Sequence, residues 1–237
     1  ELYYYMREII ASGDAGMIAA GVGGLRTEAL NYKTLRDTAR IEEFKAAMGK
    51  LKMPRDVEAY AALDETVAWF EGRPAPAPFK PQWNHPINWE RMKVVTHETT
   101  VTLETAKGKV VLELYPEWAP GSVANFLELA GTGFFNEKAF HRVVPNFVVQ
   151  GGCPRGDGYG GMPWTLRTEI GRKPFTTGSV GLASAGRDTE SCQFFITHSP
   201  TPHLDGRYTR FGEVVSGMDV VWMLQVGDVM ERVERIE

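Results

Sequence analysis

A proline-rich segment divides the chain and constrains its fold more than any other feature. Residues 73–81 (RPAPAPFKP) contain four of the fourteen prolines. Proline lacks a backbone N–H and has a fixed φ, so this segment cannot lie inside a helix or a central strand and favours extended polyproline II. Before it, apolar residues recur at helical spacing; after it, they alternate with polar residues. The sequence therefore predicts a helical domain over residues 1–72, a linker over 73–92 and a β-rich domain over 93–237.

Cap residues divide the helical domain into four predicted helices. Asp14 and Asp56 are suited to N-caps, and Gly49 and Gly72 to left-handed C-terminal positions. The helices are expected over residues 2–11, 14–27, 32–48 and 56–72. The second contains Gly21, Gly23 and Gly24, each costing about 0.5–1 kcal/mol relative to Ala, which indicates either close helix packing or a break.

These helices form hairpins with short turns. Such hairpins resemble HEAT-type solenoid repeats, and a plain helical bundle is the alternative, because no clear repeat period is present. The chain begins at Glu1 inside an apolar, tyrosine-rich stretch, so we expect it to be part of a longer protein.

Composition excludes several classes of function. A net charge of −4 without Lys/Arg clusters argues against a nucleic-acid partner, and no apolar run approaches the roughly 18 residues of a membrane span. The two cysteines, Cys153 and Cys192, have no CxxC spacing and no neighbouring histidine set, so free thiols are expected and no metal site. The loop GDGYGG at residues 156–161 lacks the following Lys-Ser or Lys-Thr of a phosphate-binding loop.

The second domain shows strand periodicity. Residues 94–105 and 110–114 predict a hairpin, and residues 231–237 predict a closing strand. Helices are expected at residues 120–130 and near 218–224. Many short strands with two helices favour a closed or nearly closed β-barrel with a helix capping each end.

One hairpin brings together residues suited to chemistry. Arg142 and Gln150 lie four residues on either side of Asn146, so a tight turn there places both side chains on one face. Phe195 reaches this region from another strand, whereas Phe194, of opposite parity, is expected in the core.

Three sequence motifs together resemble those of a known protein family. They are FHRVVPNFVVQGG at residues 140–152, SCQFF at 191–195 and the stretch that begins with Leu204-Asp205-Gly206. In order and spacing they resemble the cyclophilins, specifically bacterial forms, over residues 99–237. The resemblance implies a cyclophilin-like barrel and a peptidyl-prolyl cis-trans isomerase that needs no cofactor and acts in protein folding.

By this resemblance Arg142 is the catalytic residue. Gln150 and Gln193 would support Arg142 and the substrate carbonyl. The remaining substrate-binding residues implied are Phe147, Val148, Phe195 and Leu204 around the proline, Ala183 and Ser184 through their main chains, and His203 and Tyr208 at the edges. The partners implied are proline-containing peptides and unfolded or partly folded proteins.

Two positions depart from the common pattern. His203 stands where the family commonly has a tryptophan that contacts cyclosporin, which puts binding of that drug in doubt, and Ser184 replaces a common asparagine.

Fusion to a helical segment resembles bacterial proteins that are often exported, which favours a periplasmic or exported location. It also suggests that a protein partner binds the helical domain. The alternative function is a proline-peptide binding module and scaffold with weak or no catalysis. Arg142 distinguishes the isomerase from this alternative, because a pure binding module has little use for it.

Overall fold

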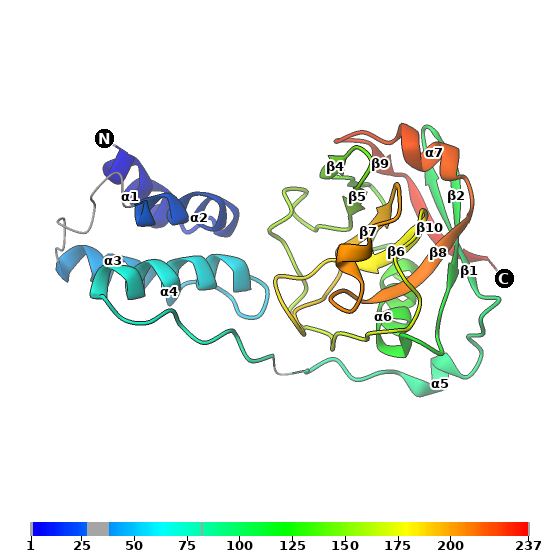
Figure 1. Ribbon diagram of the computed structural model, residues 1–237, viewed down its shortest axis with the longest axis horizontal. Coiled ribbons are helices and arrows are strands. Elements are labelled where there is room, and N and C mark those ends of the chain that lie inside the picture. Colours follow the sequence, from blue (N-terminus) through cyan, green and yellow to red (C-terminus); the bar gives the residue numbers. More distant parts are fainter. Residues whose placement is uncertain (1, 28–37, 82, 237) are drawn as a thin grey trace. The chain divides into compact units, whose positions relative to one another are not determined.

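The computed structural model describes residues 2–27, 38–81 and 83–236 and divides into two compact units, Glu1–Lys80 and Pro81–Glu237 (Figure 1). In the described part, no helix has both the length and the apolar character needed to cross a membrane.

In the described part of the first unit, all regular elements are helices. Its elements are α1 (Leu2–Ser12), α2 (Ala15–Gly21), the 3-10 helix η1 (Val22–Arg26), α3 (Thr38–Met48) and α4 (Val57–Glu71). Helices α2 and α3 pack against α4, and Ile18, Leu25, Phe44 and Leu63 are at most 1% exposed at the centre of the unit's core. The predicted helical segment is therefore confirmed, whereas its assignment to HEAT repeats stays a prediction.

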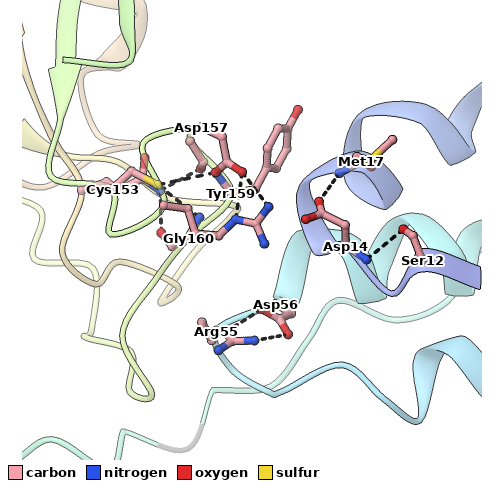
Figure 2. Close-up of polar contacts among 12 residues, drawn as sticks. Ser12, Asp14, Met17, Arg55, Asp56, Cys153, Asp157, Tyr159 and Gly160 are labelled. Atoms are coloured by element: carbon pink, nitrogen blue, oxygen red, sulfur yellow. Dashed lines mark hydrogen bonds and ion pairs between the residues drawn. The ribbon is translucent and has the colours of Figure 1, made fainter. Parts of the chain in front are cut away.

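The caps of these helices agree only in part with the sequence analysis. Asp14 caps α2 by accepting a hydrogen bond from the Met17 backbone N–H at 2.9 Å (Figure 2). Asp56 does not cap α4 with its side chain, because its carboxylate accepts from the Lys52 N–H at 2.8 Å and pairs with Arg55. Gly72 has the expected left-handed conformation, with φ of 69°.

Three further predictions concern the ends of these helices. The glycine-rich stretch after α2 breaks the α-helix, which continues as the 3-10 helix η1 and not to Thr27 as one α-helix. Gly49 does not adopt a positive φ, so the left-handed end predicted there is wrong. Residues 32–37, the first part of the predicted third helix, lie outside the described residues.

The second unit is built around one curled, antiparallel, eight-stranded sheet, which forms a half-barrel. Its order is β10-β1-β2-β8-β6-β7-β5-β4. The bounds are β1 (Thr100–Thr105), β2 (Gly108–Leu114), β4 (Arg142–Val144), β5 (Val148–Gly151), β6 (Ser179–Leu182), β7 (Phe194–Thr197), β8 (Arg210–Ser216) and β10 (Arg232–Ile236). A second, two-stranded sheet pairs β3 (Lys138–Ala139) with β9 (Val229–Met230). The mainly β fold is confirmed, and full closure of the barrel stays a prediction.

Helices lie beside this sheet at the expected positions in the chain. They are α6 (Pro120–Gly131) and α7 (Met218–Met223), whereas the short α5 (Trp89–Met92) was not predicted and lies in the segment expected to be a linker. Phe126 of α6 contacts the rings of Phe135, Phe194 and Phe211 inside the core. The Glu169 carboxylate accepts hydrogen bonds from the first turn of α6, which fixes the start of that helix.

Part of the segment expected to be a linker packs against the second unit. The His85 ring stacks on Trp164 with 4.3 Å between the ring centroids, and Met92 is buried in the core. This packing follows from the apolar and aromatic side chains that replace the Ala-Pro pattern after residue 81.

Candidate active site

The β4–β5 hairpin places Arg142 directly opposite Gln150, as the spacing about Asn146 predicts. Asn146 takes a left-handed φ of 59° in the turn, a conformation that asparagine tolerates better than most residues. Gln150 in turn lies opposite Phe195 of β7. Three strands thus bring the predicted residues onto one face of the sheet.

A chain of side-chain hydrogen bonds holds the Arg142 guanidinium. Its Nη1 donates to Gln150 Oε1 at 3.3 Å, and Gln150 Nε2 donates to Gln193 Oε1 at 3.0 Å. Gln193 Nε2 then donates to the carbonyl oxygens of Gly158 and Gly160, at 2.7 and 2.8 Å. The orientation of Arg142 is therefore linked through two amides to a loop.

That loop is held by its own polar contacts (Figure 2). The Cys153 sulfur accepts from the Gly160 N–H at 3.3 Å, and the Asp157 carboxylate accepts from the Tyr159 N–H at 2.9 Å and from Arg155 Nε at 2.8 Å. Its sequence predicts only a loop that binds no phosphate. The two carbonyls that fix Gln193 were missed, because main-chain acceptors leave no signature in residue types.

An apolar cluster lies beside the guanidinium. Its buried members are Val148, Phe175, Phe195 and Leu204, and its half-buried members are Phe147, Ala183 and Tyr208. Phe175 stacks on Phe195 with ring centroids 5.7 Å apart. The sequence analysis did not identify Phe175, because it is a single aromatic residue in a polar segment and shows no periodicity.

A surface hollow of about 380 Å³ opens over this cluster. Phe147, Leu204 and Tyr208 belong to both the hollow and the cluster, and Ser184 also lines the hollow. The His203 ring lies 5.2 Å from that of Phe147. The guanidinium carbon of Arg142 lies 5.6 Å from the centre of the Phe147 ring, within the range of a cation–π contact.

Each residue that the sequence assigns to the site belongs to the hydrogen-bond chain, the cluster or the hollow. The arrangement combines the exposed Arg142 guanidinium, amide groups and apolar rings. Such a site suits a ligand with an apolar ring next to a polar amide.

Two ionisable side chains, which adjoin Arg142 and Gln193 in the sequence, carry no charge at neutral pH. Burial lowers the pKa of His141, the preceding residue; Asp157 raises this pKa, and Arg142 lowers it further. The imidazole is therefore neutral at neutral pH. Burial also raises the pKa of Cys192 to about 12, so its thiol stays protonated and is a poor nucleophile. In the described part of the chain, no group of three or more metal-ligating side chains is placed to hold a metal.

A buried carboxyl group in the second unit makes stability depend on pH. Glu190 is fully buried and accepts from Thr168 Oγ1 at 3.0 Å and from Thr209 Oγ1 at 3.4 Å. Burial, the largest cause, raises its pKa above the usual 4.5, while the Thr168 hydrogen bond lowers it. Because the folded protein favours the protonated form, Glu190 contributes stability below pH 4.5 that is lost as pH rises through its raised pKa.

Glu190→Gln replaces the carboxyl group with a group of similar shape that stays neutral at every pH. As the pH is raised from 4 to 8, we expect the free energy of unfolding of this variant to increase relative to that of the wild type. Urea unfolding at both pH values measures this difference, and Glu98→Gln, an exposed carboxyl, is the control. If the difference between Glu190→Gln and the wild type is the same at both pH values, Glu190 does not carry this pH dependence.

Comparison with known proteins agrees with this geometry. Residues 100–236, more than half of the chain, match the model of the family described as "Cyclophilin type peptidyl-prolyl cis-trans isomerase/CLD". The chain belongs to this family. The cyclophilin resemblance expected from the sequence is thereby confirmed, and the activity that characterises the family is peptidyl-prolyl isomerisation.

Relatives of this cyclophilin include curated isomerases. "Peptidyl-prolyl cis-trans isomerase B" of Bacillus subtilis is 50% identical over 131 residues, which cover 54% of this chain and 91% of the relative. A "Peptidyl-prolyl cis-trans isomerase" of Helicobacter pylori is 44% identical over 136 residues, covering 56% and 83%.

Solved structures show the same fold. A cyclophilin-type isomerase of Cryptosporidium parvum superposes with a TM-score of 0.56 at 27% identity, covering 59% of this chain and 98% of that one. A second structure of that protein, determined in the presence of the dipeptide Ala-Pro, has the same TM-score at 28% identity, covering 58% and 99%.

Proposed function

We propose that the second unit accelerates cis-trans isomerisation of X-Pro bonds in peptides and in unfolded or partly folded proteins, with Arg142 as the catalytic residue. The observation that carries this proposal is the guanidinium, which is held by Gln150 and lies beside the apolar cluster. A proline ring placed on the cluster brings its amide nitrogen towards Arg142.

The reaction itself explains why a single donor is sufficient. Rotation about the X-Pro bond breaks amide resonance, with a barrier of about 18–20 kcal/mol. In the twisted state the nitrogen regains a lone pair that it does not have in the planar ground state. A hydrogen bond from Arg142 to this lone pair stabilises only the transition state, which is the requirement for catalysis.

The energy needed is modest. Uncatalysed isomerisation takes tens of seconds, so a turnover of about 10² to 10³ per second requires about 5 kcal/mol of transition-state stabilisation. A charge-assisted hydrogen bond in a partly dry site supplies about 2–4 kcal/mol, and fixed placement of the ring and carbonyl supplies the rest.

The other site residues are assigned roles around this bond. Phe147, Val148, Phe195 and Leu204 hold the proline ring, and Gln150 and Gln193 orient Arg142 and the substrate carbonyl. Ala183 and Ser184 contact the substrate main chain; since the Ala183 N–H already donates to the Gln193 carbonyl at 2.9 Å, Ala183 offers only its own carbonyl. His203 and Tyr208 border the proline.

NMR exchange spectroscopy on an Ala-Ala-Pro-Ala peptide tests the proposal. With the full chain at micromolar concentration, we expect cis-trans exchange at least about a hundredfold faster than in buffer. Exchange at the buffer rate, with the protein folded and the peptide bound, would exclude catalysis and leave a proline-binding module.

A further inference from the structure

Two arginines that have no place in the proposed reaction border the same hollow. Arg187 and Arg207 line it together with Phe147, Ser184, Leu204 and Tyr208. They come from different segments: Arg187 lies in the loop that follows β6, and Arg207 follows the 3-10 helix Pro202–Leu204, which contains His203 and Leu204. Two separate parts of the chain therefore each place one guanidinium group at the hollow.

Neither guanidinium is engaged within the protein. Both residues are exposed, and across residues 2–27, 38–81 and 83–236 no hydrogen bond or ion pair is formed by either side chain. Other arginines of this unit do have carboxylate partners: Arg155 pairs with Asp157, and Arg210 pairs with Glu213.

The hollow is positively charged although the chain as a whole is not. No Asp or Glu lines it, whereas the formal net charge of the chain is −4. The nearest carboxylates in sequence, Asp188 and Asp205, accept from the backbone N–H groups of Thr168 and Phe175. Arg142 adds a third guanidinium next to the hollow, because its guanidinium carbon lies 5.6 Å from the ring centre of Phe147, which lines the hollow.

We propose that Arg187 and Arg207 select substrates that carry an acidic side chain next to the proline. This inference rests on the proposed function of the hollow as the proline site. Guanidinium binds carboxylate through paired N–H donors, and a side chain one residue from the proline lies within reach of the rim of a hollow of this size.

The expected effect is moderate because the arginines are exposed. An exposed ion pair contributes little binding free energy. For each arginine we therefore expect only about a two- to fivefold effect on kcat/KM. Salt screens exposed charges over about 10 Å at 0.1 M and over shorter distances as its concentration rises, so the preference must shrink in concentrated NaCl.

The test compares matched peptides that differ in one side chain. Ala-Glu-Pro-Ala is paired with Ala-Gln-Pro-Ala, and Ala-Ala-Pro-Glu-Ala with Ala-Ala-Pro-Gln-Ala, because Gln keeps the shape of Glu without its charge. NMR exchange gives kcat/KM and NMR titration gives Kd for each peptide. The proteins are the full chain, Arg187→Gln, Arg207→Gln and the double variant. Arg172→Gln is the control, because it removes the same charge from an exposed position outside the hollow.

We expect the Glu peptide of at least one pair to be preferred by about fivefold in 20 mM NaCl. The preference should fall to near one in the double variant and in 0.5 M NaCl, and persist in Arg172→Gln. A Glu-to-Gln ratio near one in the wild type, or one unchanged in the double variant, would overturn this inference. The proposed function is tested separately, because it fails if neither Gln peptide is accelerated. In that case the Kd values of the Glu and Gln peptides still show whether the two arginines prefer a charged side chain.

Discussion

Replacing Arg142 with Ala is expected to lower kcat/KM for an Ala-Pro peptide by about a hundredfold or more. Removal of one transition-state donor from a preorganised site typically costs 10²–10³ in rate. Among the described residues the exposed guanidinium has only the Gln150 hydrogen bond and the Phe147 ring as partners, so the free energy of unfolding should change by less than about 0.5 kcal/mol. NMR exchange and urea unfolding measure the two quantities.

Two further variants make this prediction specific. Arg142→Lys keeps the charge but loses the planar donor geometry that matches Gln150, so we expect an intermediate rate. Arg172→Ala, at an exposed position away from the hollow, should leave the rate unchanged. An Arg142→Ala protein as fast as the wild type would show that the apolar cluster alone supplies catalysis.

Peptide binding by the same variant separates an isomerase from a scaffold. If Arg142 acts only in the transition state, Kd for the ground-state peptide should change by no more than about threefold while the rate falls. A parallel loss of binding and rate would instead make Arg142 part of a proline-binding surface.

Local spacing predicted the part of the site that depends on strand parity. The Arg142–Gln150 pair follows from a two-residue period about a turn, and the separation of Phe194 into the core from Phe195 on the site face follows from the same rule. The helix at residues 120–130 was likewise predicted to within one residue, because its apolar positions recur every three to four residues.

The parts that were missed depend on contacts between distant segments. Gly158 and Gly160 act through carbonyl oxygens, and Phe175 joins the cluster by stacking on a strand some twenty residues away. Asp56 in the helical unit was missed for a different, local reason: its carboxylate accepts from the Lys52 N–H four residues before it and not from the first turn of α4. Composition describes net charge, but only the fold places Arg187 and Arg207 around one hollow.

Adding a single methyl group at Gly181 is expected to disturb both stability and activity. Gly181 lies in β6, between Phe195 of β7 and Arg210 of β8, so its backbone cannot move freely. A Cβ there would lie 2.5 Å from Phe195 Cζ and 2.9 Å from Phe175 Cε1. Overpacking of this kind costs about 1–3 kcal/mol, so Gly181→Ala should unfold at lower urea concentration.

The activity loss follows from where the displaced ring must go. Phe195 lies against Gly181 and belongs to the apolar cluster, so we expect relief of the clash to move its ring towards the place proposed for the proline. We expect kcat/KM to fall about tenfold, mainly through KM, because proline binding and not the Arg142 donor is affected. Gly131→Ala is the matched control: nothing lies within 4 Å of its added methyl group, and the gain in helix propensity should leave stability equal or higher. If Gly181→Ala matches the wild type in stability and KM, the Phe195 ring has room to move elsewhere, and the proline pocket does not depend on a glycine at this position.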